Sequence, residues 1–567
     1  MTRHKAIAAA LVAGGIFLRI WGIRFGPYYP DEPLVIHHAM GFGTGDLNPH
    51  MFFFPSLFLY MVFGVIGGLY GALSVLGRIS GPEGFLNFYL LEPERVFLCA
   101  RLLSVFFGGL TLVLVYRFGK AMGGSRAGLW SCALLSAGLL HVRDSHFGVT
   151  DVTLAFFMTW SLYCLWRFAD RNGGRDWLWA AVLAGVAAAI KYNAFIIFVP
   201  IAAALWLERW PREVSFAVSV RSRIVRTGVT ALVMCGVFFV LSPFVFIDHA
   251  GFVRDVGVIL KQNLSYHLPA WHHARHLFWG MGPLVFVFAI LGVILCIRRF
   301  RPAEGVLVMY LVIYYLMIQR AGQPFQRYVI GMIPLMTVMA GIALDASMSA
   351  LAGRGTGARR AAVLLGVLVI GSCATPAVYS DILMSRKDTR ALCGEWIMTH
   401  APDGSVVAMD DPMHLPQLPV TRSQIQAKIQ SFQSTSGALG NQKNIKLQAL
   451  GNLNPYPYPS YELYYLHPTP SADPKFVMYS PQIPFDSKEL ERIGVEFLVA
   501  SEASLRANPS FYAQVIRNWE QVAVFDPRRS ADHPIALNLT YMPIDPRLFN
   551  YKRTGPLIYV YSPRKPK

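Results

Sequence analysis

The sequence predicts an α-helical polytopic membrane protein that ends in a smaller soluble α/β domain. Composition is the first reason, because 54% of the 567 residues are hydrophobic and only 15% are charged, whereas soluble domains carry about 25% charged residues. Apolar stretches long enough to cross a bilayer then follow one another as far as residue 380. After that residue the chain becomes polar and rich in Pro and Tyr, which indicates a domain in water.

About eleven stretches approach the roughly 20 apolar residues that a helix needs to cross the hydrocarbon core. They cover residues 6–23, 95–119, 127–142, 151–169, 176–191, 193–208, 227–246, 280–297, 304–320, 329–346 and 361–379. We assign them to a transmembrane domain over residues 1–380. The stretch at 55–78 is also long enough to cross, but one more crossing would invert every later loop. We therefore expect it to be an outer-face juxtamembrane or re-entrant segment, or half of a hairpin.

The charges of the loops predict how the spans are oriented. If the N-terminus is cytoplasmic, every second loop faces the cytoplasm and should carry Arg and Lys. Those loops hold Arg117, Lys120 and Arg126; Arg167, Arg171 and Arg175; Arg209, Arg212, Arg221, Arg223 and Arg226; Arg298, Arg299 and Arg301; and Arg354, Arg359 and Arg360. The pattern predicts a multi-pass protein of the plasma (inner) membrane whose C-terminal domain is periplasmic, or extracytoplasmic in general. The loops also account for much of the net charge of +18, so no nucleic-acid partner is expected.

The C-terminal domain, residues 381–567, combines short β-like runs with helical segments. The β-like runs are 405–409, 495–500, 521–525 and 557–561, and the helical segments are 389–400 and 487–493. Such a combination is typical of a small α/β domain. We expect the aromatic stretches at 455–459 and 461–465 to be packed loops, with a sugar-stacking surface as the alternative.

An acidic pair, Asp31-Glu32, follows the first apolar span and lies between two prolines. Two adjacent carboxylates at a membrane surface are costly to bury and unnecessary for anchoring, so they indicate a functional role. The predicted topology brings further polar side chains to the same outer face. These are Arg101, Arg143, His146, Asp151, Lys191, Tyr192, His267, Arg327 and Tyr328. The alternatives are structural, because Lys191 also suits an interfacial snorkel and Asp151 a helix N-cap.

Carboxylates and cations on one face suit the transfer of a group from a lipid phosphate to a hydroxyl. A carboxylate takes the proton of the acceptor hydroxyl or orients that hydroxyl. The cations stabilise the charge that develops on the departing phosphate. An apolar groove between helices would hold the lipid tail.

The order of these motifs resembles the GT-C superfamily of integral-membrane glycosyltransferases. The motifs are Asp31-Glu32, Asn48-Pro49-His50, Arg101 to Ser104, His141 to His146 with Asp151, Lys191-Tyr192 and Phe325 to Tyr328. The resemblance is strongest to bacterial relatives of protein O-mannosyltransferases and aminoarabinose transferases, which use polyprenyl-phosphate sugars. It implies a hexosyl- or pentosyltransferase that moves a sugar from such a donor in the lipid bilayer to a hydroxyl at the extracytoplasmic face. The acceptor, a protein, a lipid or a polysaccharide, stays open.

The resemblance also implies roles for individual residues. Asp31, with Glu32 beside it, matches the catalytic acid of the first outer loop, and Asp151 matches the acid of the second. The donor phosphate is assigned to Arg143, Lys191, Arg327 and Arg101, and the acceptor or a headgroup to His146, Tyr192, Tyr328 and His267. Two other functions are weighed: a transporter or flippase of lipid-linked sugars, and a ligase or polymerase of the same fold that uses a longer glycan.

No cofactor is expected, because basic residues are available to neutralise the leaving phosphate. Two alternatives involve a divalent metal. In one, Asp31 and Asp151 share an ion; in the other, histidines near Trp271 bind it, since His272 and His276 lie on one helix face. We expect these histidines to contact acceptor or headgroup instead, because polar aromatic side chains are common at the membrane interface.

Overall fold

The computed structural model describes residues 3–26, 29–171, 174–208, 215–264, 268–320, 324–410, 415–432, 438–468, 480–533 and 542–564. The chain divides into two compact units. The first unit contains Met1–Ile23, Val35–Ile66 and Leu98–Asp381, and the second contains Arg24–Leu34, Gly67–Phe97 and Ile382–Lys567. The second unit therefore combines the C-terminal residues with two short segments from the N-terminal part of the chain.

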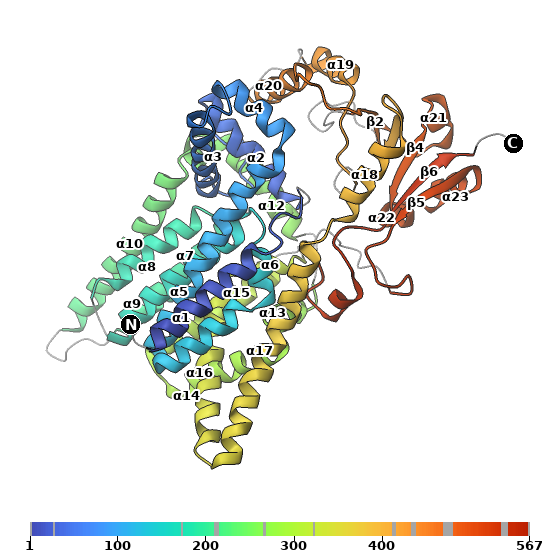
Figure 1. Ribbon diagram of the computed structural model, residues 1–567. Helices are drawn as coiled ribbons and strands as arrows, with labels where there is room; N and C mark the ends of the chain where they lie inside the picture. The colour runs from blue at the N-terminus through green and yellow to red at the C-terminus, as the bar shows by residue number, and fades with distance from the viewer. Residues whose placement is uncertain are drawn as a thin grey trace. The chain divides into compact units, whose positions relative to one another are not determined.

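Helices build the first unit (Figure 1). In chain order they are α1 (Arg3–Ile20), α5 (Pro93–Ser136), α6 (Leu139–Asp144), α7 (Thr150–Arg171), α8 (Asp176–Ala188), η2 (Tyr192–Ile197), α9 (Phe198–Leu207), α10 (Phe216–Leu241), α11 (Phe244–Ile247), α12 (His249–Leu264), α13 (His272–Met281), α14 (Pro283–Arg299), α15 (Pro302–Arg320), η3 (Gln326–Val329), α16 (Ile333–Ala352) and α17 (Thr356–Met384). Two further helices, α2 (Asp31–Gly41) and α3 (Leu57–Val75), pass from one unit to the other, as do the first residues of α5 and the last residues of α17. The short helix η1 (Phe42–Thr44) lies between α2 and α3. Every predicted span overlaps one or two of these helices, in the predicted order, and two spans share α5.

Among the described residues, seven helices are long and apolar enough to cross a membrane, or up to eight if the bent pair α13 and α14 forms one span. Two predicted spans fall on shorter apolar helices, Asp176–Ala188 and Tyr192–Leu207. The predicted class, a polytopic helical membrane protein, is confirmed. The segment α3 also meets the length and hydropathy criteria, so its outer-face location stays a prediction.

The second and third predicted spans form a tight helical hairpin within α5. Its two helices meet at Gly124, whose φ of +90° is a backbone conformation that other residues rarely adopt. A Cβ added at Gly128 would lie 2.6 Å from the carbonyl oxygen of Tyr116, so the two helices approach too closely for a larger residue.

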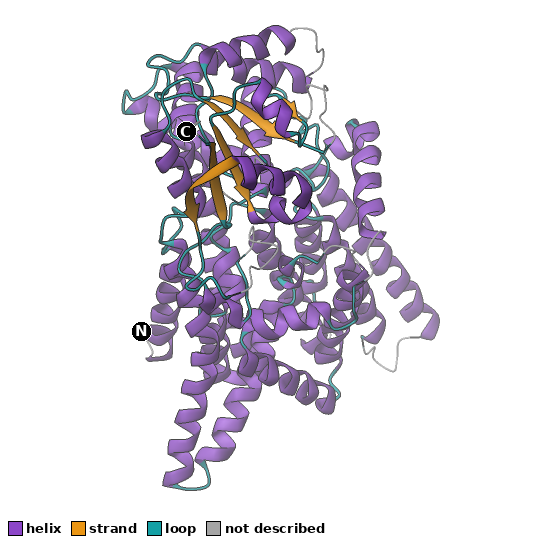
Figure 2. Ribbon diagram, turned by 90° about the vertical axis from the view of Figure 1, so that its right-hand side faces the viewer, coloured by secondary structure: helices purple, strands orange, loops and turns teal. Residues whose placement is uncertain are grey.

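The second unit contains one mixed β-sheet with helices against it (Figure 2). Its elements are α4 (Gly81–Leu91), α18 (Thr389–His400), β1 (Val406–Met409), α19 (Arg422–Phe432), α20 (Ala438–Gly451), β2 (Glu462–Leu466), β3 (Gln482–Ile483), α21 (Ser487–Arg492), β4 (Phe497–Ser501), α22 (Glu502–Ala507), α23 (Pro509–Asn518), β5 (Trp519–Phe525), η4 (Pro546–Asn550) and β6 (Ile558–Pro563). The strand order is β3-β2-β1-β4-β6-β5. The first four strands in that order are parallel, and β6 is antiparallel to both β4 and β5.

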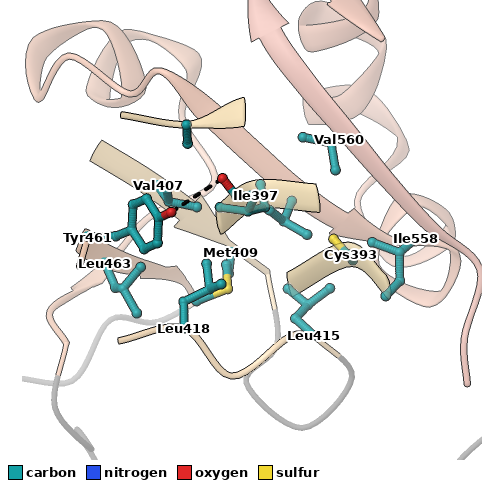
Figure 3. Packing of buried hydrophobic residues seen from close by; sticks show 12 residues of the cluster. Cys393, Ile397, Val407, Met409, Leu415, Leu418, Tyr461, Leu463, Ile558 and Val560 are labelled. Atoms are coloured by element: carbon teal, nitrogen blue, oxygen red, sulfur yellow. Dashed lines mark hydrogen bonds between the residues drawn. The ribbon is translucent and has the colours of Figure 1, made fainter. Parts of the chain in front are cut away.

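Alternating side chains give each face of this sheet its own core. Val407 and Met409 of β1 pack with Cys393 and Ile397 of α18 on one face (Figure 3). Because successive side chains of a strand point to opposite faces, Ala408 packs in the other core, with residues of α21 and α23. The predicted α/β domain is confirmed.

The aromatic run at 461–465 is not a loop. Residues 462–466 form β2, which pairs in parallel with β1. Tyr461 is fully buried, and its hydroxyl donates a hydrogen bond of 3.3 Å to the carbonyl oxygen of Ile397 (Figure 3). The loop prediction was wrong because closely spaced tyrosines occur both in strands and in packed loops, so the sequence alone does not separate the two.

Candidate functional site

Asp151 is the centre of a group of charged side chains in the first unit. Only 3% of this residue is exposed. Nζ of Lys191 lies 2.8 Å from Oδ1 of Asp151, and Nε of Arg327 lies 3.9 Å from Oδ2. Both cations are largely buried, so salt screens these ion pairs less than it would at the surface. The structure thus brings together three residues that the sequence predicted for the site.

Helix ends and interruptions place these three side chains. Asp151 lies in the first turn of α7, where the helix dipole favours negative charge. Lys191 has an extended backbone, with φ −154° and ψ 128°, between α8 and the 3-10 helix η2. Arg327 belongs to the short 3-10 helix η3, which precedes α16. Breaks of this kind often mark functional positions in membrane helices.

A glycine in the loop before α7 determines where that helix begins. A Cβ added at Gly148 would lie 2.6 Å from Cβ of Ala100, so the loop can approach α5 this closely only with glycine. This close approach fixes the start of α7, and with it the position of Asp151.

Arg143 and Asp144 form a second ion pair in the same neighbourhood. Nε and Nη2 of Arg143 lie 2.8 Å and 2.7 Å from Oδ1 of Asp144, and Nη1 donates to the side-chain oxygen of Gln326. Burial raises the pKa of Asp144, and the adjacent Arg143 opposes that shift. The charges of Asp151 and Arg327 also act on Asp144, so the two ion pairs influence each other.

Polar and aromatic side chains surround the Asp151–Lys191 pair. The amide of Asn193 donates to the hydroxyl of Tyr314 at 3.1 Å, and that hydroxyl donates to the carbonyl oxygen of Tyr328 at 3.3 Å. Nζ of Lys191 lies 5.4 Å from the ring centroid of Tyr328, which is within the range of a cation–π interaction. The cation–π contact and the ion pair with Asp151 together orient Lys191.

The five charged groups leave an excess of one positive charge. Arg143, Lys191 and Arg327 are cations, whereas Asp144 and Asp151 are acids, so ionised acids leave a net charge of +1. A phosphate oxyanion would neutralise that charge. The arrangement therefore suits the binding of a phosphate and the stabilisation of charge that develops on it.

Asp31 and Glu32 occupy the first turn of α2. Glu32 is buried, and its backbone NH donates to the carbonyl oxygen of Tyr29 at 3.1 Å, which closes the turn before the helix. Both acids belong to the second unit, whereas Asp151 belongs to the first. That Asp31 and Asp151 serve one reaction stays a prediction.

Two predicted site residues are fully enclosed and bind backbone carbonyls. Nη1 of Arg101 donates to the carbonyl oxygen of Ile23 at 2.8 Å. The ring nitrogens of His146 lie 2.9 Å and 3.0 Å from the carbonyl oxygens of Trp21 and Val142, and burial lowers the pKa of His146 to about 4. The enclosed imidazole lies between these two carbonyl groups, and as a neutral ring it can donate to one of them, which suits holding the loop before α7.

Tyr192 and His267 complete the predicted set. The hydroxyl of Tyr192 donates to the carbonyl oxygen of Phe52 at 3.2 Å, and its ring packs against those of Phe238 and Phe252. Tyr192 therefore lies one residue from Lys191 but faces a separate aromatic group. His267 lies outside the described residues.

Sequence reasoning assigned no role to Gln326, which accepts a hydrogen bond from Arg143. Nor did it assign one to Asn193 and Tyr314, which bond to each other. Gln326 precedes Arg327, and Asn193 lies two residues after Lys191. Their nearness in the sequence to these predicted cations could therefore have identified them. Tyr314 lies inside an apolar span with Tyr310 and Tyr315, and tyrosines there are equally typical of simple packing.

Removing the carboxylate of Asp144 should destabilise the protein. We expect Asp144→Ala to lower the free energy of unfolding by about 3–5 kcal/mol, because it leaves the buried charge of Arg143 without this partner. The unfolding temperature of the purified protein in detergent measures the effect. Adding Arg143→Met should restore part of the loss, whereas Glu395→Ala, which breaks an exposed pair with Lys387, should change little. An Asp144→Ala protein as stable as that control would contradict the expectation.

The fold and the charged group together define a class of protein. It is a multi-pass helical membrane protein with a buried, net cationic group, joined to an α/β domain. The family model described as dolichyl-phosphate-mannose-protein mannosyltransferase matches residues 93–247, which include Arg143, Asp151 and Lys191. This match confirms the resemblance to GT-C glycosyltransferases that the sequence motifs predict.

Two solved structures illustrate further similarity. ArnT from Cupriavidus metallidurans bound to undecaprenyl phosphate shares 14% sequence identity over 97% of both chains, with a TM-score of 0.49. The Archaeoglobus fulgidus oligosaccharyltransferase, tethered to an acceptor peptide containing an NVT sequon, shares 14% identity over 90% of this chain and 70% of that chain, with a TM-score of 0.48. No curated protein matches the chain in sequence.

Proposed function

We propose that this protein is a membrane glycosyltransferase that moves a sugar from a polyprenyl-phosphate donor to a hydroxyl acceptor. The observation that carries the proposal is the buried group in which Asp151 holds Lys191 and Arg327 beside the Arg143–Asp144 pair. Its net positive charge matches the single negative charge of a sugar phosphodiester. The description of the matching family model also names a lipid-phosphate sugar.

The reaction takes place at the extracytoplasmic face in this proposal. The alternating basic loops favour a cytoplasmic N-terminus, and with that orientation the charged group lies at the outer ends of the spans. The transmembrane domain, residues 1–380, then supplies the donor site within the plasma (inner) membrane. The domain of residues 381–567 lies on the same side as the acceptor.

The transfer breaks one bond and forms another at the anomeric carbon of the sugar. The acceptor hydroxyl oxygen attacks that carbon while its proton passes to Asp31, with Glu32 adjacent. The bond from the anomeric carbon to the phosphate oxygen breaks, and the electron pair leaves with the polyprenyl phosphate. Lys191, Arg327 and Arg143 stabilise the charge on that phosphate, and Asp151 keeps the two nearest cations in position.

The donor phosphate needs no metal ion in this scheme. Oδ1 of Asp151 faces Lys191 and Oδ2 faces Arg327, so both oxygens are engaged by cations. The cations supply the charge stabilisation that a divalent metal supplies in other phosphate sites.

A transfer assay with purified protein tests the proposal. The protein is incubated with a panel of polyprenyl-phosphate monosaccharides and with candidate acceptors, and products are identified by mass spectrometry. We expect a new glycosidic bond and release of polyprenyl phosphate with one of the donors. Movement of a donor across vesicles without any new bond would instead establish the transporter alternative. Transfer of longer glycans only would establish a ligase or polymerase.

A further inference from the structure

Three histidines, His272, His273 and His276, cluster at the N-terminal end of α13. Each offers one ring nitrogen, and these three nitrogens all lie within 4.8 Å of one another. Their spacing accounts for the cluster, because residues three and four positions apart are neighbours on a helix surface. The three rings contact one another edge to face, with centroids 4.5 Å to 5.5 Å apart.

Several nitrogens of this cluster are enclosed without a hydrogen bond. His273 is fully buried and, although the backbone of Ile318 lies close enough to act on the ring, neither of its ring nitrogens has a hydrogen bond of ordinary geometry. The same holds for the enclosed Nδ1 of His276. Nearly all buried polar atoms have a partner, so such nitrogens in one cluster require an explanation. A bound ion would give them one.

We propose that His272, His273 and His276 bind a divalent transition-metal ion, with zinc as the best fit. Imidazole nitrogen is a preferred ligand of zinc and of the neighbouring transition metals, whereas magnesium and calcium prefer oxygen. Three histidines also leave one coordination position open, as in zinc sites that bind a water molecule or a substrate oxygen.

The distances are compatible with one ion after small ring movements. Zinc–nitrogen bonds of about 2.0–2.1 Å in tetrahedral geometry put the ligand nitrogens roughly 3.3 Å apart. Starting from 4.8 Å or less, each ring must therefore move by roughly 1 Å. His272 can make such a movement because its side chain is partly exposed. Its contact with the carbonyl oxygen of Pro324 is also long and therefore weak, with 3.5 Å between that oxygen and Nε2.

The surroundings of the cluster favour an anion at the open position. The cluster itself contains no carboxylate, and the positive charges of Arg143 and Arg275 act on His276. A divalent ion among neutral imidazoles and guanidinium groups is best balanced by hydroxide or a phosphate oxygen.

The ion would also fix the ring of His273, which packs against the segment that carries Arg327. The rings of His273 and Tyr328 are stacked, with centroids 6.2 Å apart, and α13 packs against η3. Metal binding would therefore make the surface of α13 that η3 packs against more rigid. The proposal itself rests on the histidine cluster alone and not on the proposed transferase function.

Cobalt binding to the full-length protein in detergent tests the proposal. The protein is stripped of metal with a chelator and titrated with Co²⁺, whose visible absorption reports nitrogen coordination of low symmetry. We expect an equimolar amount of Co²⁺ to bind and Zn²⁺ to displace it. His276→Asn and His272→Asn should each weaken binding at least about tenfold, because one of three ligands is lost.

The matched control is His249→Asn, an exposed histidine of the same unit. It should bind Co²⁺ as the unaltered protein does. Because His272 is partly exposed, its variant should fold normally, and the elution profile and unfolding temperature verify this. Absence of the cobalt signal from the unaltered protein, or equal binding by a folded His272→Asn protein, would overturn the metal site. Neither readout depends on sugar transfer.

Discussion

Asp31→Asn should remove most of the sugar transfer while the protein still folds and inserts. If Asp31 accepts the proton of the acceptor hydroxyl, an amide in its place cannot, and kcat should fall by about 10²–10⁴-fold. The KM for the donor should change little, because other residues bind the phosphate. Initial rates at saturating polyprenyl-phosphate sugar measure both quantities.

Two variants sharpen this test. Glu32→Gln should reduce kcat less than Asp31→Asn, since we place Asp31 ahead of Glu32 as the base. Glu83→Gln changes an exposed acid in the first turn of α4 and should leave the rate unaltered. Full activity of a folded Asp31→Asn protein would remove this role from Asp31 but leave the phosphate site standing.

Lys191→Gln should impair the departure of the phosphate. The ammonium group of Lys191 lies 2.8 Å from Asp151 in the structure and is one of the three cations that we assign to the donor phosphate. Loss of one such preorganised donor typically lowers kcat by about 10²–10³-fold. The measurement is the initial rate of transfer, together with the affinity for polyprenyl phosphate alone.

Asp151 offers a second way to examine Lys191. If Asp151 acts by holding Lys191, then Asp151→Asn should cost little further activity once Lys191 has been changed to Gln. Lys120→Gln, at an exposed lysine of a predicted cytoplasmic loop, is the matched control. Rates and donor affinity of Lys191→Gln equal to those of this control would exclude Lys191 from the phosphate site.

Most helices were predictable because their signals are local. Hydropathy and loop charge identified the spans in order. The pair Gly123-Gly124 lies between the second and third predicted spans, and the helix α5 bends at Gly124. Asp388 accepts a hydrogen bond of 2.9 Å from the backbone NH of Arg390, the N-cap contact that starts α18. The strand β2 was missed because its aromatic residues are explained only by neighbours distant in the sequence, such as Met409 of β1, which pairs with Tyr465.

The candidate site was predictable in its residue types but not in its pairings. The sequence identified Asp151, Lys191 and Arg327 as polar residues at span ends. It did not show that Asp151 lies between the other two, or that Arg143 pairs with Asp144. Nor did it separate the enclosed His146 from a residue available to a headgroup.

By itself, the sequence determined the class of this protein: the order of apolar helices, the α/β tail and the residue types available for chemistry. These properties follow from local composition, because the bilayer and the helix period act on neighbouring residues. Only the tertiary structure decided which charges meet. The side chain of Arg143 reaches Gln326 across 183 positions of sequence, and Lys191 reaches Asp151 across 40. Such contacts depend on how several helices pack, and no local pattern encodes that packing.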